Sequence, residues 1–80
     1  MKNIAIVTGA NGQLGSVFSE ALIKKGYFVY AVDINVENIN TSDNIQPVEL
    51  DITNEMSVHK FFSSIQDLDV LVNNAGIGVF

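Results

Sequence analysis

The residues best suited to binding chemistry lie in one short stretch, which reads Thr8-Gly9-Ala10-Asn11-Gly12-Gln13-Leu14-Gly15. An apolar run, 4–7, precedes it and a helical pattern follows it, so the glycines lie where a strand gives way to a helix. A helix N-terminus offers unpaired N–H groups and about half a positive charge, so it can bind an anion without a cationic side chain. The stretch contains no cationic residue. The order of strand, glycine-rich turn and helix therefore predicts a site for the phosphates of a dinucleotide.

Each of the three glycines has a separate task in such a site. Gly9 permits a tight turn at the end of the strand, and Gly12 lets the backbone come close to a pyrophosphate. Gly15 lacks a side chain, so the new helix can lie against the strand. The pair Asn11-Gly12 is also a strong hairpin signal, but the residues after it repeat with a helical period, which favours the helix.

Polar residues also follow the other apolar runs of the chain. Asp33 comes at the end of the second run and is followed by Ile34, Asp51 follows the third run, and residues 73–76 follow the fourth. Because the carboxyl ends of parallel strands meet at one edge of a sheet, these residues should converge on the glycine-rich stretch. The Asp33 carboxylate can accept hydrogen bonds from the hydroxyls of an adenosine ribose and would repel a 2′-phosphate. Since the chain has no Arg to bind such a phosphate, we predict NAD over NADP as the cofactor.

The predicted elements form an α/β domain. We predict strands over 2–8, 27–32, 45–50 and 69–73, and helices over 13–25 and from Thr53 or Asn54 to about 66. Residues 34–44 are expected to form a loop or at most a short turn of helix. Pro47 cannot donate to a strand ladder, so the third strand should lie at the edge of the sheet. The order predicts a doubly wound parallel sheet of about four strands, ordered 3-2-1-4 with helices on both faces, which is a partial Rossmann fold.

Both predicted helices carry an apolar stripe that should pack on the sheet. The stripe of the first helix consists of Leu14, Val17, Phe18, Ala21 and Leu22. The stripe of the second helix consists of Val58, Phe61, Phe62 and Ile65. Met56 is expected in the core with the two phenylalanines. His59 lies off the apolar positions and is expected in solvent.

The composition excludes several classes of function. The 80 residues carry a net charge of −5, which argues against binding to nucleic acid or to anionic membranes. The chain has no Cys, which excludes disulfides and thiolate metal sites, and we predict no metal site. No apolar run approaches the roughly 18 residues of a membrane span, and the start lacks the apolar length of a secretion signal, so we expect a cytoplasmic protein.

The chain resembles the short-chain dehydrogenase/reductase family. The resemblance rests on the glycine-rich stretch, on Asp33, on Asp51-Ile52-Thr53 and on the tetrad Asn73-Asn74-Ala75-Gly76 after a Val-rich strand. It covers nearly the whole chain but only the N-terminal half of a family member, so residues 1–80 are expected to be the truncated first half of an NAD(P)-binding Rossmann domain.

The resemblance also implies roles for single residues. Leu14 would lie under the pyrophosphate, and Asp51 and Ile52 would flank the adenine. Asn74, Ala75 and Gly76 would line the ribose on the nicotinamide side, and Asn74 would also brace the sheet. The predicted cofactor-binding residues are Gly9, Asn11, Gly12, Gln13, Leu14, Gly15, Asp33, Ile34, Asp51, Ile52, Asn74, Ala75 and Gly76.

Two departures from the family pattern bear on the reaction. The glycines are spaced G-x-x-G-x-x-G, which is typical of the extended branch of the family. The family's catalytic Tyr is followed four residues later by Lys, whereas Tyr27 and Tyr30 are followed at that offset by Ala31 and Ile34. We therefore predict no catalytic residue in this chain. The primary hypothesis is the NAD-binding portion of a dehydrogenase/reductase-like oxidoreductase, inactive by itself. The alternatives are the same half of an extended-branch nucleotide-sugar epimerase or dehydratase, or a non-catalytic dinucleotide-binding module.

The polar residues also have purely structural interpretations. Asp33 could be a solvated strand end, Asp51 could form a helix-capping turn, and Asn73 and Asn74 could be turn formers. The outer edge of the fourth strand should be open, which makes it a template for pairing. We therefore expect a homo-oligomer or a missing C-terminal half.

Overall fold

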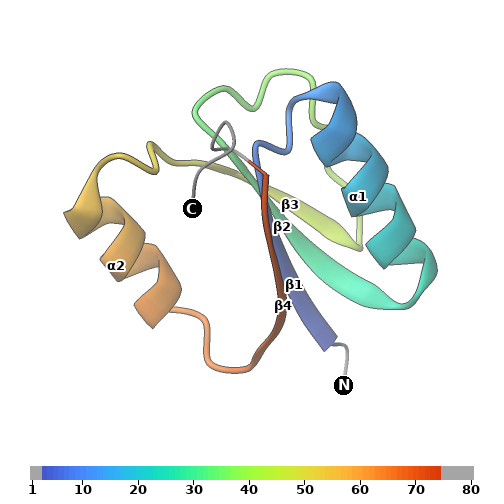
Figure 1. Cartoon of the computed structure of the whole chain (residues 1–80). Coiled ribbons are helices and arrows are strands. Elements are labelled where there is room, and N and C mark those ends of the chain that lie inside the picture. Colours follow the sequence, from blue (N-terminus) through green and yellow to red (C-terminus); the bar gives the residue numbers. More distant parts are fainter. Residues whose placement is uncertain (1–2, 75–80) are drawn as a thin grey trace.

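A four-stranded parallel sheet lies at the centre of the computed structural model, which describes residues 3–74. The elements are β1 (Asn3–Thr8), α1 (Gln13–Lys24), β2 (Tyr27–Asp33), β3 (Ile45–Glu49), α2 (Glu55–Ser63) and β4 (Leu68–Asn73). The strands are ordered β3-β2-β1-β4, and each neighbouring pair is parallel. The helices α1 and α2 lie on opposite faces of the sheet (Figure 1). This arrangement confirms the predicted partial Rossmann fold and its strand order.

The two central strands form the core. Ala5, Ile6 and Val7 of β1 and Val29 and Ala31 of β2 are fully buried. Burial on both faces explains why these strands are nearly continuous apolar runs instead of alternating patterns. Thr8 pairs with Val32 at the carboxyl end of the two strands, so Asp33 lies one residue beyond the last pair.

The β2–β3 connection replaces a crossover helix with a loop, as predicted. Residues 34–44 contain a turn closed by the Ile39 N–H, which donates to the Val36 carbonyl (3.1 Å), and the Ile39 side chain packs against the core. Pro47 lies in β3, which pairs only with β2 within the described sheet. The expectation that Pro47 marks an edge strand is therefore confirmed.

The face by which α1 contacts the sheet differs from the predicted stripe. Gly15 and Ser19 are the buried residues of this helix. Leu14 and Val17 are 57% and 55% exposed, so their assignment to the packed face was wrong, as was that of Ala21, which is also exposed. The reason is steric, because a Cβ atom on Gly15 would lie 2.2 Å from the Gly9 carbonyl oxygen. Small residues therefore occupy the closest contact, and the large side chains of Phe18, Leu22 and Ile23 pack against the core around it.

The second helix lies farther from the sheet. It begins after Asn54 and ends at Ser63, before the predicted end near Gln66, and none of its residues is buried. Met56 is 83% exposed, so its assignment to the core was wrong. Val58, Phe61 and Phe62 line the space between α2 and the sheet. A helix held at this distance buries one narrow face, which leaves Met56 in solvent.

Candidate functional site

The glycine-rich stretch forms a tight turn between β1 and α1. Gly9 has a φ of +66°, a conformation that favours glycine. The Gly12 N–H donates to the Gly9 carbonyl (3.2 Å), and the Ala10 N–H donates to the Val32 carbonyl (3.0 Å). Because α1 begins at Gln13, the hairpin interpretation of Asn11-Gly12 is excluded.

The start of α1 is open to an anion, whereas the start of α2 is already occupied. Gly12 is the N-cap of α1 and makes no side-chain capping bond, and the first turn has no acidic residue. In α2 the Asn54 side chain accepts a hydrogen bond from the Ser57 N–H (3.1 Å), and Glu55 lies in the first turn. The two helices therefore differ in whether their terminal N–H groups and positive dipole ends are available to a ligand.

Gly12 and Gly15 have different steric surroundings. A Cβ atom on Gly15 would clash with backbone atoms of Gly9 and Ala10, but one on Gly12 would meet the Gly9 oxygen at an ordinary 3.5 Å. Gly15 is thus needed for packing within the chain. Nothing within the described fold requires a glycine at position 12, which leaves close approach of a ligand as a reason for it.

Asp33 is held against the glycine-rich turn. Its Oδ2 accepts from the Asn11 N–H (2.9 Å) and its Oδ1 accepts from the Asn35 N–H (3.1 Å). The Asn11 side-chain Oδ1 accepts in turn from the Asn38 N–H (3.2 Å). Asp33 is half-buried, so it is not simply a solvated strand end, while the adjacent Ile34 is 64% exposed.

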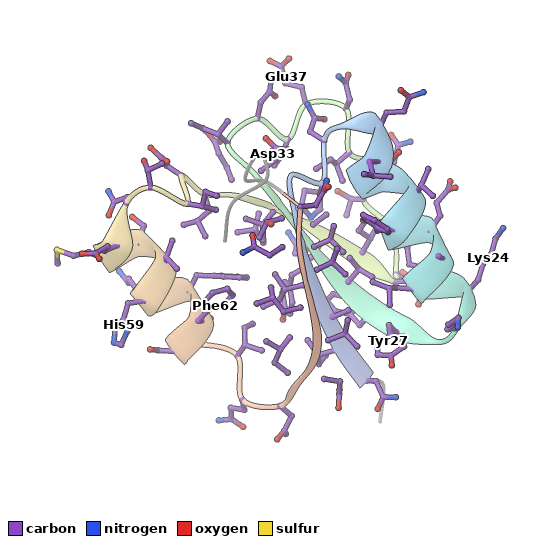
Figure 2. All side chains as sticks on the ribbon, in the orientation of Figure 1. Lys24, Tyr27, Asp33, Glu37, His59 and Phe62 are labelled. Carbon is purple, nitrogen blue, oxygen red and sulfur yellow. The ribbon has the colours of Figure 1, made fainter. Side chains whose placement is uncertain are left out.

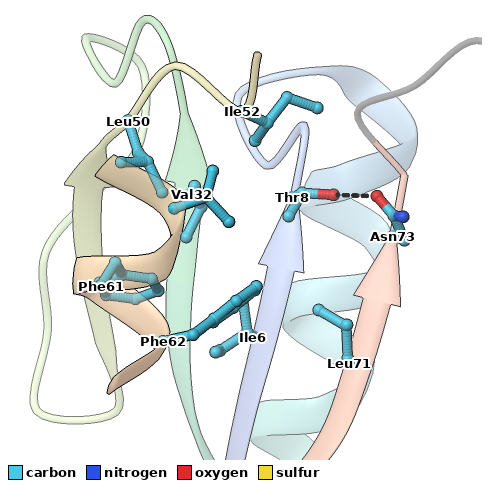
Figure 3. Close-up of a pocket in the computed structure, with 10 residues that line it drawn as sticks. Ile6, Thr8, Val32, Leu50, Ile52, Phe61, Phe62, Leu71 and Asn73 are labelled. Carbon is cyan, nitrogen blue, oxygen red and sulfur yellow. Dashed lines mark hydrogen bonds between the residues drawn. The ribbon is translucent and has the colours of Figure 1, made fainter. Parts of the chain in front are cut away.

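The turn is also tied to β4. The Thr8 hydroxyl donates to Asn73 Oδ1 (3.1 Å) and accepts from the Asn74 N–H (2.9 Å). Figure 3 shows the Thr8–Asn73 bond at the carboxyl end of the strands. The Asn74 Nδ2 group donates to the Gly9 carbonyl (3.5 Å). These contacts give Asn73 and Asn74 more than a turn-forming role, whereas Ala75 and Gly76 lie outside the described residues.

Asp51 is engaged with its own turn. Its Oδ1 accepts from both the hydroxyl (2.6 Å) and the N–H (2.9 Å) of Thr53. These hydrogen bonds, the hydroxyl bond foremost, hold the pKa of the exposed Asp51 carboxyl below its ordinary value. The contacts match the interpretation of Asp51 as the start of the turn that leads to the Asn54 cap of α2.

A cavity of about 160 Å³ lies between α2 and the sheet, with one end at the carboxyl edge (Figure 3). Ile6 and Val32 line it from the sheet, and Phe61 and Phe62 line it from α2. Ile52, a predicted site residue, is half-buried in its wall. The predicted site thus borders an apolar space with polar groups at one end.

The remaining candidates for chemistry lie away from this edge. Tyr27 is at the opposite end of β2 from Asp33 (Figure 2), and the Tyr30 ring packs on the Phe61 ring with centroids 5.7 Å apart. His59 is exposed, as expected. Within residues 3–74, no group of three His, Cys, Asp or Glu residues could hold a metal ion. Over the same residues, neither helix has the length and hydropathy needed to cross a membrane.

Sequence reasoning missed three residues that organise the site. In the sequence Thr8 is only the first residue of the glycine-rich stretch, and Asn35 and Asn38 are only part of a polar loop. The abundance of Asn in 34–44 was the available signal. No spacing rule could pair Asn38 with Asn11, because α1 and β2 lie between them in the chain.

Comparisons with known proteins place these features in a family context. The model of the family described as short chain dehydrogenase matches residues 3–80. The NADPH-dependent 1-acyldihydroxyacetone phosphate reductase of Saccharomyces cerevisiae is 34% identical, over 94% of this chain and 29% of that protein. The 15-hydroxyprostaglandin dehydrogenase (NAD+) of Homo sapiens is 33% identical, over 92% of this chain and 33% of that protein.

Solved structures show the same similarity. A 4-hydroxyisoleucine dehydrogenase complexed with NADH superposes with a TM-score of 0.81 at 29% identity, over 94% of this chain and 34% of that one. A short chain dehydrogenase from Leptospira borgpetersenii with bound NAD+ gives a TM-score of 0.84 at 28% identity, over 100% and 34% of the two chains. The chain therefore spans about a third of the length of the relatives it matches.

Proposed function

The chain belongs to the short-chain dehydrogenase/reductase family, and from that premise we propose that it is the N-terminal, NAD-binding half of a Rossmann domain. We propose further that it has no oxidoreductase activity by itself. The dehydrogenase and reductase names of its relatives favour an oxidoreductase over an epimerase or dehydratase. Bound NAD would supply hydride transfer, and the residues of this chain would bind and orient it.

The proposed binding mode follows the strand ends. The first turn of α1, from Gly12 to Gly15, would receive the pyrophosphate, with Leu14 beneath it. Asp33 and Ile34 would contact the adenosine ribose. Asp51 and Ile52 would flank the adenine, and residues 74–76 would line the ribose on the nicotinamide side. The uncapped helix start and the lack of a steric need for Gly12 support this assignment.

The preference for NAD over NADP depends on Asp33. The observation that carries it is the 2.9 Å bond from the Asn11 N–H to Asp33 Oδ2, which holds a negative charge beside the turn that would bind the phosphates. A 2′-phosphate on the ribose would be repelled by this carboxylate. Relatives of both kinds exist, since the yeast reductase is named for NADPH and the human dehydrogenase for NAD+.

Titration with NADH, followed by nicotinamide fluorescence, tests the proposal. We expect saturable binding, with NADPH bound at least about tenfold more weakly because of charge repulsion. Asp33→Asn keeps the shape of the side chain but removes its charge, so it should reduce the discrimination between the two nucleotides. Gly12→Ala should weaken both nucleotides with little change in thermal unfolding. Absence of NADH binding at about millimolar concentrations would overturn the proposal.

A second proposal concerns the outer edge of β4. Within the described sheet, β4 pairs only with β1, and Leu68 and Leu71 on it are 39% and 47% exposed. We propose that a second copy of the chain or the remainder of a longer protein covers this edge. Sedimentation of the 80-residue chain tests the first possibility, and a monomer at high concentration would exclude it.

A further inference from the structure

We propose that Asn11 is a positioning residue that sets the discrimination between NAD and NADP through Asp33. This inference rests on the proposed function, because it concerns how the nucleotide-facing carboxylate is held. Asn11 binds the end of β2 through its backbone N–H and the 34–44 loop through its side chain. Its role would be to lock the 34–44 loop, and with it the Asp33 side chain, in one arrangement.

The contacts form a closed ring. Asn11 N–H donates to Asp33 Oδ2 at 2.9 Å, and Asn11 Oδ1 accepts from the Asn38 N–H at 3.2 Å. The chain then leads back from Asn38 to Asn35, whose N–H donates to Asp33 Oδ1 at 3.1 Å. Both carboxylate oxygens are thereby restrained, one from the turn and one from the loop.

Asp33 is the one member of this ring in a regular element, and the Asn11 side chain joins the turn to the 34–44 loop. The 34–44 loop has no helix to fix its position; the Asn38 N–H ties it to the turn, and the Asn35 N–H ties it to the end of β2. Asn11 is half-buried and uncharged, so it accepts a backbone N–H without adding repulsion near the phosphates. Removing its Oδ1 would open the ring while leaving its own backbone N–H bond to Asp33 in place.

Opening the ring should change the selectivity between NADH and NADPH more than the free energy of unfolding. In Asn11→Ala the loop loses its hydrogen bond to the turn while Ile39 still packs against the core, so the Asn35 N–H is held less firmly against Asp33 Oδ1. The carboxylate stays bound to the Asn11 N–H at Oδ2 but gains freedom at Oδ1, which should weaken NADH binding and reduce the repulsion of a 2′-phosphate. We expect the ratio of the NADPH to the NADH dissociation constants to fall about three- to tenfold, the size expected for one hydrogen bond.

Fluorescence titration of further variants with NADH and NADPH tests the inference. Asn11→Asp keeps an Oδ1 acceptor for Asn38, so its ratio should equal or exceed that of the wild-type chain. Asn40→Ala removes an exposed Asn from the same loop and should leave the ratio unchanged. In an Asp33→Asn background, adding Asn11→Ala should not change the ratio further, because Asn11 acts through the Asp33 charge.

Amide hydrogen exchange supplies a readout that does not need nucleotide. The Asn35 and Asn38 amides should exchange faster in Asn11→Ala than in the wild-type chain, with the core amides of β1 unchanged. An unchanged nucleotide ratio in Asn11→Ala, with wild-type NADH binding intact, would overturn this inference alone. Failure of the wild-type chain to bind NADH would overturn the proposed function and the selectivity role together.

Discussion

The two helices of this chain contact the same sheet in different ways. The buried residues of α1 are Gly15 and Ser19, whereas α2 has no buried residue. α1 starts without a side-chain cap, and α2 starts with the Asn54 cap. A cavity of about 160 Å³ remains between α2 and the sheet.

The difference shows that an apolar stripe does not determine how close a helix comes to a sheet. Both helices have apolar residues at helical spacing, but only α1 has small residues where its backbone meets the turn. Close approach at Gly15 brings the open start of α1 to the carboxyl edge of the sheet. Phe61 and Phe62 are too large for such an approach, so α2 covers the sheet at a distance.

The largest expected loss of stability comes from blocking the close contact between α1 and the glycine-rich turn. In Gly15→Ala the new Cβ would lie 2.2 Å from the Gly9 oxygen and 2.7 Å from the Ala10 Cα. We expect the free energy of unfolding to fall by about 3 kcal/mol or more, measured by urea denaturation. Gly12→Ala is the matched control and should cost less than about 1 kcal/mol. Similar losses in the two variants would contradict the close approach at Gly15.

Larger side chains on the two faces of the sheet should change the free energy of unfolding in opposite directions. Ala31 is fully buried in the core cluster on the α1 side, so Ala31→Val should destabilise the chain by about 1–3 kcal/mol through overpacking. Val58 borders the cavity under α2, so Val58→Ile should stabilise it by about 0.5–1 kcal/mol. Thermal unfolding of both variants measures the contrast. A loss of stability in Val58→Ile would show that the cavity cannot accept a methyl group.

Removing the cap of α2 should have a smaller effect. Asn54→Ala deletes the acceptor of the Ser57 N–H and should cost about 1 kcal/mol in the free energy of unfolding. Asn54→Asp retains a capping oxygen and should retain wild-type stability. Chemical denaturation compares the two, and equal destabilisation by both would show that the cap does not stabilise α2.

The smallest expected effect is a shift in the pKa of Asp51, which lies in the turn before α2. Thr53→Val removes the stronger of the two hydrogen bonds to Asp51, so the pKa of this carboxyl should rise toward its ordinary value. Because the folded-state pKa is lowered, these bonds contribute stability above the unfolded-state pKa, and this contribution is lost as pH falls through the folded-state pKa. NMR titration of Asp51 measures the shift, and Thr53→Ser, which keeps the hydroxyl, should titrate as the wild-type chain does.

Local patterns were sufficient to predict the elements and their order. The buried runs of β1 and β2 depend on near neighbours, and Pro47 at the edge depends on the covalent geometry of one residue. The position of the closest contact of α1 was not predictable in this way. It depends on the distance between Gly15 and Gly9, and a helical stripe contains no information about the surface it will meet.

Part of the candidate site was likewise predictable from the sequence, and part of it was not. A binding role could be predicted from the residue types in the glycine-rich stretch and at Asp33, because binding a phosphate or a ribose restricts which side chains can be present. The hydrogen bonds between Asn11 and Asn38 and between Thr8 and Asn74 could not be predicted, because the partners are far apart in the chain.

The sequence by itself determined the α/β class, the strand order and the end of the sheet where polar groups gather, since period and turn chemistry act over a few residues. Only the tertiary structure decided which face of α1 is buried, how far α2 lies from the sheet and what holds Asp33. These depend on which atoms meet across the fold, and packing at that range is set by the shapes of all the neighbours together.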